Sequence, residues 1–234
     1  MVLLDIFNLQ GYGHLLVEGT FITITVGIAA MVVALGLGVV GALARLSKLR
    51  WLRNVGTTYA TVVRGIPELV LMLIVYYGGT VLLQQLLSLG GGDVRVDINA
   101  FLAGTLVLGF VYGAYATEIF RGAFLAVPKG QIESAIAFGM SDFGTFRRIL
   151  LPQAMRLAIP GLGNLWLTLM KATSITSVIG LTELARQADL IKNPTHAPFT
   201  VYFVACLLYL LLTAISDLFR LRIDHWASSG FRRG

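Results

Sequence analysis

Polar side chains recur on one face of an otherwise apolar stretch, and one of them is charged. Asn164, Thr168 and Lys171 occupy positions i, i+4 and i+7, which share a helical face, and Ser174 follows. The stretch 157–181 is long enough to cross a membrane, where an ionisable group near the centre is costly. The face predicts a polar wall along a translocation path. The alternative for Lys171 is a structural hydrogen bond or ion pair at a subunit interface.

Two further pairs of charged residues interrupt the apolar sequence. In the segment RGIPEL, Arg64 and Glu68 flank Pro67, whose missing N–H is expected to kink or break a helix. Arg64 is interpreted as a residue of the kink or of the membrane boundary, with substrate contact as the alternative. Glu68 is a second candidate for the substrate path. Glu118 and Arg121 lie three residues apart and are expected to pair.

Residues 129–152 form a polar, helix-forming stretch between membrane-length apolar runs. A short helix opens at Glu133, and Gly139 is expected to end it because glycine reaches the left-handed conformation found just past helix ends. Ser141 is expected to cap a second helix, which Pro152 breaks. Two short helices in such a loop predict a docking element for another protein. A merely solvated loop is the alternative.

Several kinds of catalytic site are excluded by the motifs that the sequence lacks. It contains no G-x-x-x-x-G-K-[ST], so it cannot cradle a nucleotide with a P-loop. It also contains no G-x-S-x-G and no H-E-x-x-H. Cys206 is the single cysteine and lies in an apolar run, so neither a disulfide nor a cysteine metal site is available. The chain is not expected to be an enzyme or to hold a cofactor or metal of its own.

Composition indicates an integral membrane protein. Of 234 residues, 56% are apolar and only 13% are charged, against roughly 25% charged in soluble proteins. The mean hydropathy is +0.80. The net charge of +6 comes from basic residues scattered at the ends of apolar runs, so the expected partner is membrane lipid and not nucleic acid.

The apolar runs predict a single all-α transmembrane domain covering residues 1–234. About 20 helical residues cross the hydrocarbon of a bilayer, and the runs give five spans, near 19–44, 58–89, 101–121, 157–181 and 199–219. Four glycines of the first span, at positions 27, 36, 38 and 41, predict close approach of a neighbouring helix.

The basic residues predict the orientation of these spans. Five spans with the N-terminus outside and the C-terminus in the cytoplasm place 14 of the 18 Lys and Arg residues inside, as the positive-inside rule requires. The inner residues are Arg45, Lys48, Arg50, Arg53, Arg64, Arg121, Lys129, Arg147, Arg148, Arg156, Arg220, Arg222, Arg232 and Arg233. The segment GGGDVRVD then forms an exterior loop, and residues 129–152 lie in the cytoplasm.

The spacing within residues 129–152 resembles the EAA loop of ABC-importer membrane subunits. The matching positions are Glu133, Ser134, Ala135, Gly139, Ile149, Leu151 and Pro152. The usual Glu-Ala-Ala opening reads Glu-Ser-Ala here, which exchanges one small residue for another. In that family the loop docks into a groove on a separate ATP-hydrolysing subunit. The resemblance implies the same coupling role for these residues.

Longer segments resemble the polar-amino-acid branch of ABC permeases, in particular the Q-type subunits of histidine/lysine/arginine/ornithine importers and their opine-uptake relatives. These segments are RGIPELVLMLIVYYG, LGFVYGAYATEIFRGAFLAVPKGQIESAIAFG and GNLWLTLMKATSITSVIGL. The resemblance implies a type I importer fold in a bacterial inner membrane and transport of a basic amino acid, with an opine as the alternative. It also implies a homologous second permease, two ATPase subunits that bind ATP and Mg, and a periplasmic amino-acid-binding protein.

Two departures from that branch bear on the second subunit. Some homodimeric members carry acids at the positions of Leu165 and Ala172. The resemblance therefore implies a non-identical partner that completes the substrate site. A stand-alone channel or secondary carrier remains a further alternative. An ion-driven carrier is expected to show inverted repeats and carboxylates near the midplane, and five spans do not divide evenly.

Overall fold

The computed structural model describes residues 9–88 and 98–228, and within these ranges every regular element is a helix. Four helices are long and apolar enough to cross a membrane, and a bent pair brings the number to as many as five. The all-α membrane fold is confirmed, with four to five spans. The expected exterior loop GGGDVRVD lies outside the described residues. The four helices are Gly13–Leu46, Glu68–Ser88, Ala100–Ala126 and Pro198–His225, and the bent pair is Asp142–Ile179 with Leu184–Ile191.

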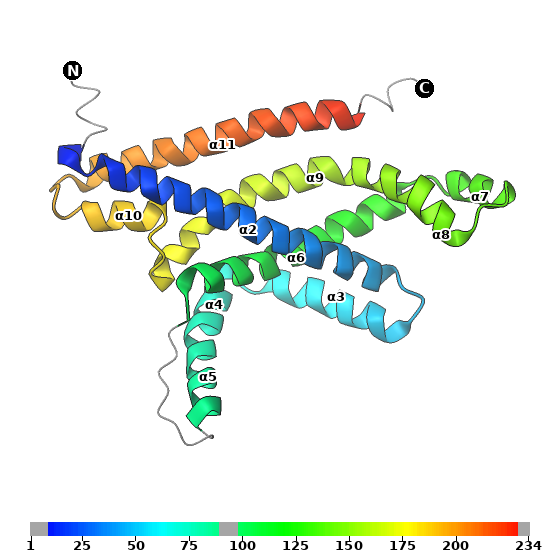
Figure 1. The fold of residues 1–234 in the computed structure, drawn as a ribbon, viewed down its shortest axis with the longest axis horizontal. Coiled ribbons are helices and arrows are strands. Elements are labelled where there is room, and N and C mark those ends of the chain that lie inside the picture. The colour runs from blue at the N-terminus through cyan, green and yellow to red at the C-terminus, as the bar shows by residue number, and fades with distance from the viewer. Residues whose placement is uncertain (1–8, 89–97, 229–234) are drawn as a thin grey trace.

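The centre of the molecule is the pair α2 (Gly13–Leu46) and α6 (Ala100–Ala126), which cross in Figure 1. A Cβ added at Gly41 would lie 2.2 Å from Thr117 Oγ1, and one at Gly38 would lie 2.5 Å from Ala116 Cβ. The backbones approach this closely only because these positions lack side chains. A Cβ added at Gly27 would lie 2.6 Å from the Sδ of Met170, in α9 (Leu151–Ala172). Among the described residues, no atom lies within 4 Å of a Cβ added at Gly36, so this chain supplies no close neighbour there.

Helix α3 (Arg50–Gly65) is separated from the next helix at Pro67. Ile66 is extended, with φ −102° and ψ 135°, as expected for a residue that precedes proline. The predicted break is confirmed, and it divides the expected span 58–89: residues 58–65 belong to α3, and the helix of membrane length begins at Glu68. From there α4 (Glu68–Leu73), a π-helical segment (Ile74–Gly78) and α5 (Gly79–Ser88) project away from the other helices (Figure 1).

Between the third and fourth spans the chain forms α7 (Lys129–Ala137) and α8 (Asp142–Thr145). A π-helical segment, Phe146–Leu150, then joins α8 to α9 (Leu151–Ala172). The expectation that Pro152 breaks this helix is wrong. Pro152 lies in the first turn of α9 and Pro160 lies inside it. The wider π turn precedes Pro152 and accommodates a residue that has no N–H to donate.

The other end of the molecule is held together by a buried carboxylate. A 3-10 segment (Thr173–Ile179) and a turn lead into α10 (Leu184–Ile191), followed by α11 (Pro198–Ser228). Glu183 caps α10, accepts a hydrogen bond from the Tyr209 hydroxyl at 2.6 Å and is fully buried. The Thr23 hydroxyl also donates to it, at 3.4 Å. One side chain thus joins α2, α10 and α11.

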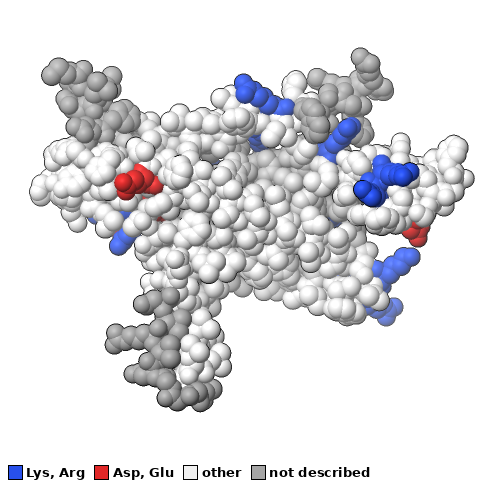
Figure 2. Space-filling model, viewed as in Figure 1, with Lys and Arg blue, Asp and Glu red and all other residues white. Residues whose placement is uncertain are grey.

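Charge is distributed unevenly along the molecule. In Figure 2 most of the visible Lys and Arg atoms lie toward the end that carries α3, α7 and α8, whereas the central surface is almost free of charge. An uncharged band between charged ends is what a membrane-embedded protein requires, because unpaired charges are costly in hydrocarbon.

Candidate functional site

The loop that joins α7 to α8 has a well-defined backbone. Gly139 adopts φ +78°, the left-handed conformation predicted for it. The Met140 N–H donates to Ala135 O at 3.1 Å and the Gly139 N–H donates to Ile136 O at 2.9 Å, which together form a Schellman motif. Ser141 caps α8 by accepting from the Gly144 N–H at 3.2 Å, as predicted. The helix α7 itself begins at Lys129, four residues before Glu133.

The expected coupling residues fall into an exposed and an anchoring set. Glu133, Ser134, Gly139 and Pro152 are exposed, Ile149 and Leu151 are half-buried, and Ala135 is buried at 6% exposure. Leu151 packs against the main hydrophobic core. The first set is available to a partner, and the second holds the loop against the membrane domain.

Two aromatic side chains on this loop were missed by sequence reasoning. Phe138 is 90% exposed and Phe143 is 71% exposed, on either side of the Gly139 turn. Between α8 and the loop lies a depression of about 310 Å³, lined by residues that include Phe143 and Arg147. Large exposed apolar side chains beside basic ones are typical of protein-interaction surfaces. The repeated Phe-Gly pair in AFGMSDFG could have indicated them.

The polar face of α9 is exposed, as its spacing predicts. Asn164, Thr168 and Lys171 are all exposed, and Ser174 is half-buried in the 3-10 segment that follows. The Thr168 hydroxyl donates to Asn164 O at 3.0 Å, and the Ser174 hydroxyl donates to Lys171 O at 2.8 Å. Lys171 lies in the last turn of α9, where the negative end of the helix dipole favours a cation. Among the described residues no ion pair to Lys171 is present.

The two positions of α9 at which some relatives carry acids do not lie on its exposed polar face. Leu165 and Ala172 are 7% and 9% exposed and belong to this chain's own hydrophobic core. They therefore lie off the exposed polar face. Any argument from this span against pairing of two identical copies thus depends on the charge of Lys171 and not on the orientation of these two side chains.

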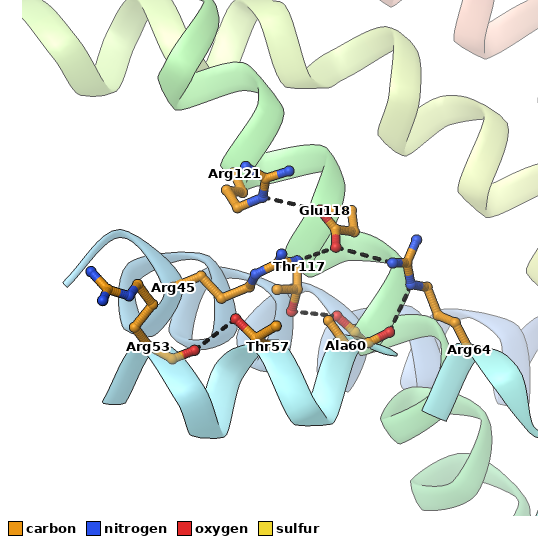
Figure 3. A network of polar contacts seen from close by, with 9 residues as sticks. Arg45, Arg53, Thr57, Ala60, Arg64, Thr117, Glu118 and Arg121 are labelled. Carbon is orange, nitrogen blue, oxygen red and sulfur yellow. Dashed lines mark hydrogen bonds and ion pairs between the residues drawn. The ribbon is translucent and has the colours of Figure 1, made fainter. Parts of the chain in front are cut away.

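Arg64 belongs to a cluster of three arginines around one carboxylate, where the last turns of α2 and α3 lie beside α6 (Figure 3). Arg64 Nη2 lies 3.0 Å from Glu118 Oε1, and Arg64 Nε donates to Ala60 O at 2.7 Å. Arg121 Nε lies 3.0 Å from Glu118 Oε2, which confirms the predicted pair. Arg45 also bonds Glu118. These contacts favour the structural interpretation of Arg64.

Glu68 and Arg64 do not meet, although they lie close in sequence. The Tyr112 hydroxyl donates to Glu68 Oε2 at 3.4 Å. Glu68 is half-buried in the first turn of α4, and Tyr112 is buried in α6. Glu68 therefore links the projecting α4 to the central helix.

The geometry described so far is that of a helical membrane subunit with an exposed two-helix loop and an uncovered polar helix face. A family model described as "Binding-protein-dependent transport system inner membrane component" matches residues 34–229. The chain belongs to this family. The match includes the α7–α8 loop and the polar face of α9, so the chain is a permease subunit of an ABC transport system and not an ATPase.

Characterised relatives cover nearly the whole permease. It is 41% identical over 225 residues to the histidine/lysine/arginine/ornithine transport system permease protein HisQ of Salmonella typhimurium, covering 96% of this chain and 98% of the relative. It is 43% identical over 229 residues to the octopine transport system permease protein OccQ of Rhizobium meliloti, covering 97% and 96%. These similarities support the resemblance to the polar-amino-acid branch.

Solved structures agree with the fold of the permease. The crystal structure of an amino acid ABC transporter with histidines matches with a TM-score of 0.82 and 30% identity, over 94% of this chain and 98% of that one. A structure of the MetNI methionine ABC transporter matches with a TM-score of 0.68 at 20% identity, a similarity of fold alone. Within residues 9–88 and 98–228, no three His, Cys, Asp or Glu residues are grouped as a metal site requires.

Proposed function

We propose that this chain is the permease subunit of an ATP-driven importer for basic amino acids: histidine, lysine, arginine or ornithine. The observation that carries the proposal is the similarity to HisQ over nearly the full length of both chains. The proposed setting is the bacterial inner membrane, with the N-terminus outside and the C-terminus in the cytoplasm, because this orientation places most basic residues inside.

In the proposed complex the α7–α8 loop docks on the ATPase. Its Schellman turn fixes the direction of α7, and Phe138 and Phe143 present apolar surface to a groove on the partner. ATP and Mg bind to two ATPase subunits. Closure of that pair moves the two loops and tilts the spans from inward-open to outward-open. A periplasmic amino-acid-binding protein then releases substrate into the cavity.

The proposed translocation path runs along the uncovered polar face of α9, against a homologous second permease. Asn164, Thr168 and Lys171 present amide, hydroxyl and ammonium groups, which suit the carboxylate of an amino acid. The Lys171 ammonium repels the cationic side chain of a basic amino acid. We therefore place the acid that holds this side chain on the second permease. Ser174, which follows this face, and Glu68 of α4 are the further residues that we assign to the path. Arg64 takes no direct part, because Glu118 and the Ala60 carbonyl occupy it.

An opine is the second candidate substrate, and the 43% identity to OccQ favours it specifically. Reconstitution of the permease with its second permease, ATPase and binding protein into proteoliposomes distinguishes the candidates. Uptake of radiolabelled arginine is measured against unlabelled histidine, lysine, ornithine and octopine. Competition by the basic amino acids but not by octopine supports the first proposal, and the reverse supports the second. Equal uptake without this chain assigns it a role as a scaffold only.

A further inference from the structure

The helix α3 (Arg50–Gly65) presents three faces of different chemistry. Successive residues of an α-helix are rotated by about 100°, so residues three, four, seven or eleven positions apart share a face. One face of α3 is buried against α2 and α6 and contains Gly56, Ala60 and Val63. The remaining two faces are exposed.

The two exposed faces of α3 differ in polarity. The apolar face consists of Trp51, Val55 and Val62, which are 63%, 60% and 50% exposed. A helix surrounded by lipid exposes apolar side chains all round, and a solvated helix exposes polar ones. The division therefore indicates a different surrounding on each side of α3. The polar face consists of Arg50, Arg53, Asn54, Thr57, Thr61 and Arg64, all of them exposed, and Thr58 lies at the boundary between the two faces.

Both faces extend to membrane depth. A Cβ added at Gly56 would lie 3.3 Å from Ala44 Cβ, at the end of the uncharged part of α2. Beyond Gly56, α3 runs back alongside α2 (Figure 1), and the Tyr59 hydroxyl donates to Phe110 O at 2.6 Å, near the middle of α6. At 1.5 Å per residue, the Cα of Arg64 lies about 12 Å beyond Gly56 along α3.

Arg64 indicates that water reaches the polar face. Its Nε donates to Ala60 O at 2.7 Å and its Nη2 lies 3.0 Å from Glu118 Oε1, so the side chain turns back toward the start of α3 (Figure 3). Arginines at membrane depth turn toward the nearer surface in this way. Its side chain is still 35% exposed, and three arginines around one glutamate carry a net charge of +2. Exposed charge of this kind is costly against acyl chains, whereas lipid would tolerate the Thr57 hydroxyl, which donates to Arg53 O at 2.8 Å.

Water covers the polar face at lower cost than a second protein helix would. The face contains three arginines, and the sequence of α3 contains no Asp or Glu. A protein partner would have to supply several acids at membrane depth, where each acid is itself costly. Water and mobile anions solvate the same charges without that cost.

We infer, on the basis of the function proposed above, that α3 is a boundary helix of the transport path. Its apolar face contacts acyl chains of the cytoplasmic leaflet, and its polar face lines a water-filled vestibule through which the amino acid leaves for the cytoplasm. The vestibule is open while the spans face inward, and it closes when the ATPase pair closes. Its basic wall repels a cationic amino acid and so opposes re-entry from the cytoplasm.

The test uses the complete transporter with nitroxide spin labels on single cysteines in a Cys206→Ala background, because Cys206 is the single native cysteine. Labels at Thr61→Cys and Val62→Cys are adjacent and so match in depth, but they lie on different exposed faces. Collision of each label with oxygen, which is enriched in hydrocarbon, is compared with collision with a neutral water-soluble nickel complex. The ratio of nickel to oxygen collision is expected to be at least about tenfold higher at position 61, because a polar complex is excluded from hydrocarbon. If this pair does not assemble, Thr57→Cys and Val55→Cys give the same comparison.

Three outcomes overturn the proposal. Equal ratios at the two positions would show that α3 has one surrounding, and low collision with both probes at position 61 would show that another subunit covers the polar face. Nickel collision at position 61 is expected to fall when ATP and vanadate trap the ATPase pair closed, and an unchanged value would show a permanently wet surface in place of a vestibule. Because the measurement requires no substrate, a failure here is distinguishable from a failure of the uptake assay.

Discussion

Two spans of similar hydropathy have very different surroundings. In α6 (Ala100–Ala126), with a mean hydropathy of 1.5, 67% of the most apolar window is buried inside the chain. In the span Glu68–Ser88, with a mean hydropathy of 1.7, only 6% of the corresponding window is buried. The first span is enclosed by its own chain, and the second is exposed to whatever surrounds it. Hydropathy therefore identifies a span, but it does not tell whether protein or lipid covers it.

The polar face of α9 resembles the span Glu68–Ser88 in that this chain leaves it uncovered. Where α2 and α6 meet, glycines of one helix lie against side chains of the other, and the hydroxyl of Thr117 donates to Gly113 O within its own helix, so this contact needs no further partner. Asn164, Thr168 and Lys171 are polar and uncovered at membrane depth, which is costly unless another subunit or water meets them. The predictions below test this division between enclosed and open surfaces.

The largest expected effect is loss of transport when the second permease is omitted. Two copies of this chain would place two Lys171 ammonium groups around one path, where like charges at such depth are unfavourable. Proteoliposomes with this chain, the ATPase and the binding protein alone are expected to show no substrate-stimulated uptake. The complete complex is the positive control. Robust uptake without the second permease contradicts the requirement for a non-identical partner.

The enclosed surface is tested by Gly41→Val. Because an added Cβ would lie 2.2 Å from Thr117 Oγ1, α2 and α6 must separate, at a cost of about 1–3 kcal/mol or more for overpacking. We expect a lower thermal midpoint and lower yield of monodisperse complex in detergent. Gly36→Val in the same helix is the control, because no atom of the described residues lies within 4 Å of a Cβ added there. Identical behaviour of the two variants would show that the close crossing does not limit stability.

The coupling loop is tested by Gly139→Val. A β-branched residue at φ +78° costs about 1–2 kcal/mol and misdirects α7 relative to α8. The variant is expected to insert normally but to lose substrate-stimulated ATP hydrolysis. Gly130→Val, within α7, serves as the control, because an added Cβ there meets no atom of the described part of the chain within 4 Å. Normal stimulated hydrolysis in an assembled Gly139→Val complex argues against this turn as the coupling element.

The smallest effect is expected at the rim of the Glu118 cluster. Arg121 is 34% exposed, so Arg121→Ala is expected to lower stability by less than about 1 kcal/mol. Arg45, at 14% exposure, is less accessible, and Arg45→Ala is expected to cost roughly 1.5–3 kcal/mol, the value of hydrogen bonds to charged groups. The thermal unfolding midpoints of both variants show which of the two substitutions destabilises the protein more. A larger loss of stability for Arg121→Ala than for Arg45→Ala would contradict the expectation that the less exposed arginine contributes more to stability.

Features with a local cause could be predicted from the sequence. The break at Pro67, the left-handed Gly139, the Ser141 cap and the Glu118–Arg121 pair all arise within a few residues, and the structure confirms each of them. The roles in coupling and transport assigned to the candidate residues stay predictions, because they depend on subunits outside this chain.

Features that depend on distant segments could not be predicted. Arg45 is 73 positions from Glu118, and no sequence pattern indicates that the end of α2 meets α6 there. The burial of Leu165 depends on which neighbours surround α9. The prediction for Pro152 was wrong because its effect depends on the π turn that precedes it, and not on the proline alone.

That π turn also gives the α7–α8 loop some tolerance to chain length. Phe146–Leu150 contains one more residue than a regular α-helical turn would need, and it is the link between α8 and α9. Deleting a single residue there would let the link wind as an ordinary α-helical turn, so that α8 and its loop would keep nearly the same direction about the axis of α9. Deleting one residue from the regular part of α9 would instead rotate α8 by about 100° and point Phe143 in a different direction. The wider turn is therefore the place in this stretch where a residue can be lost with the least change in the orientation of the loop.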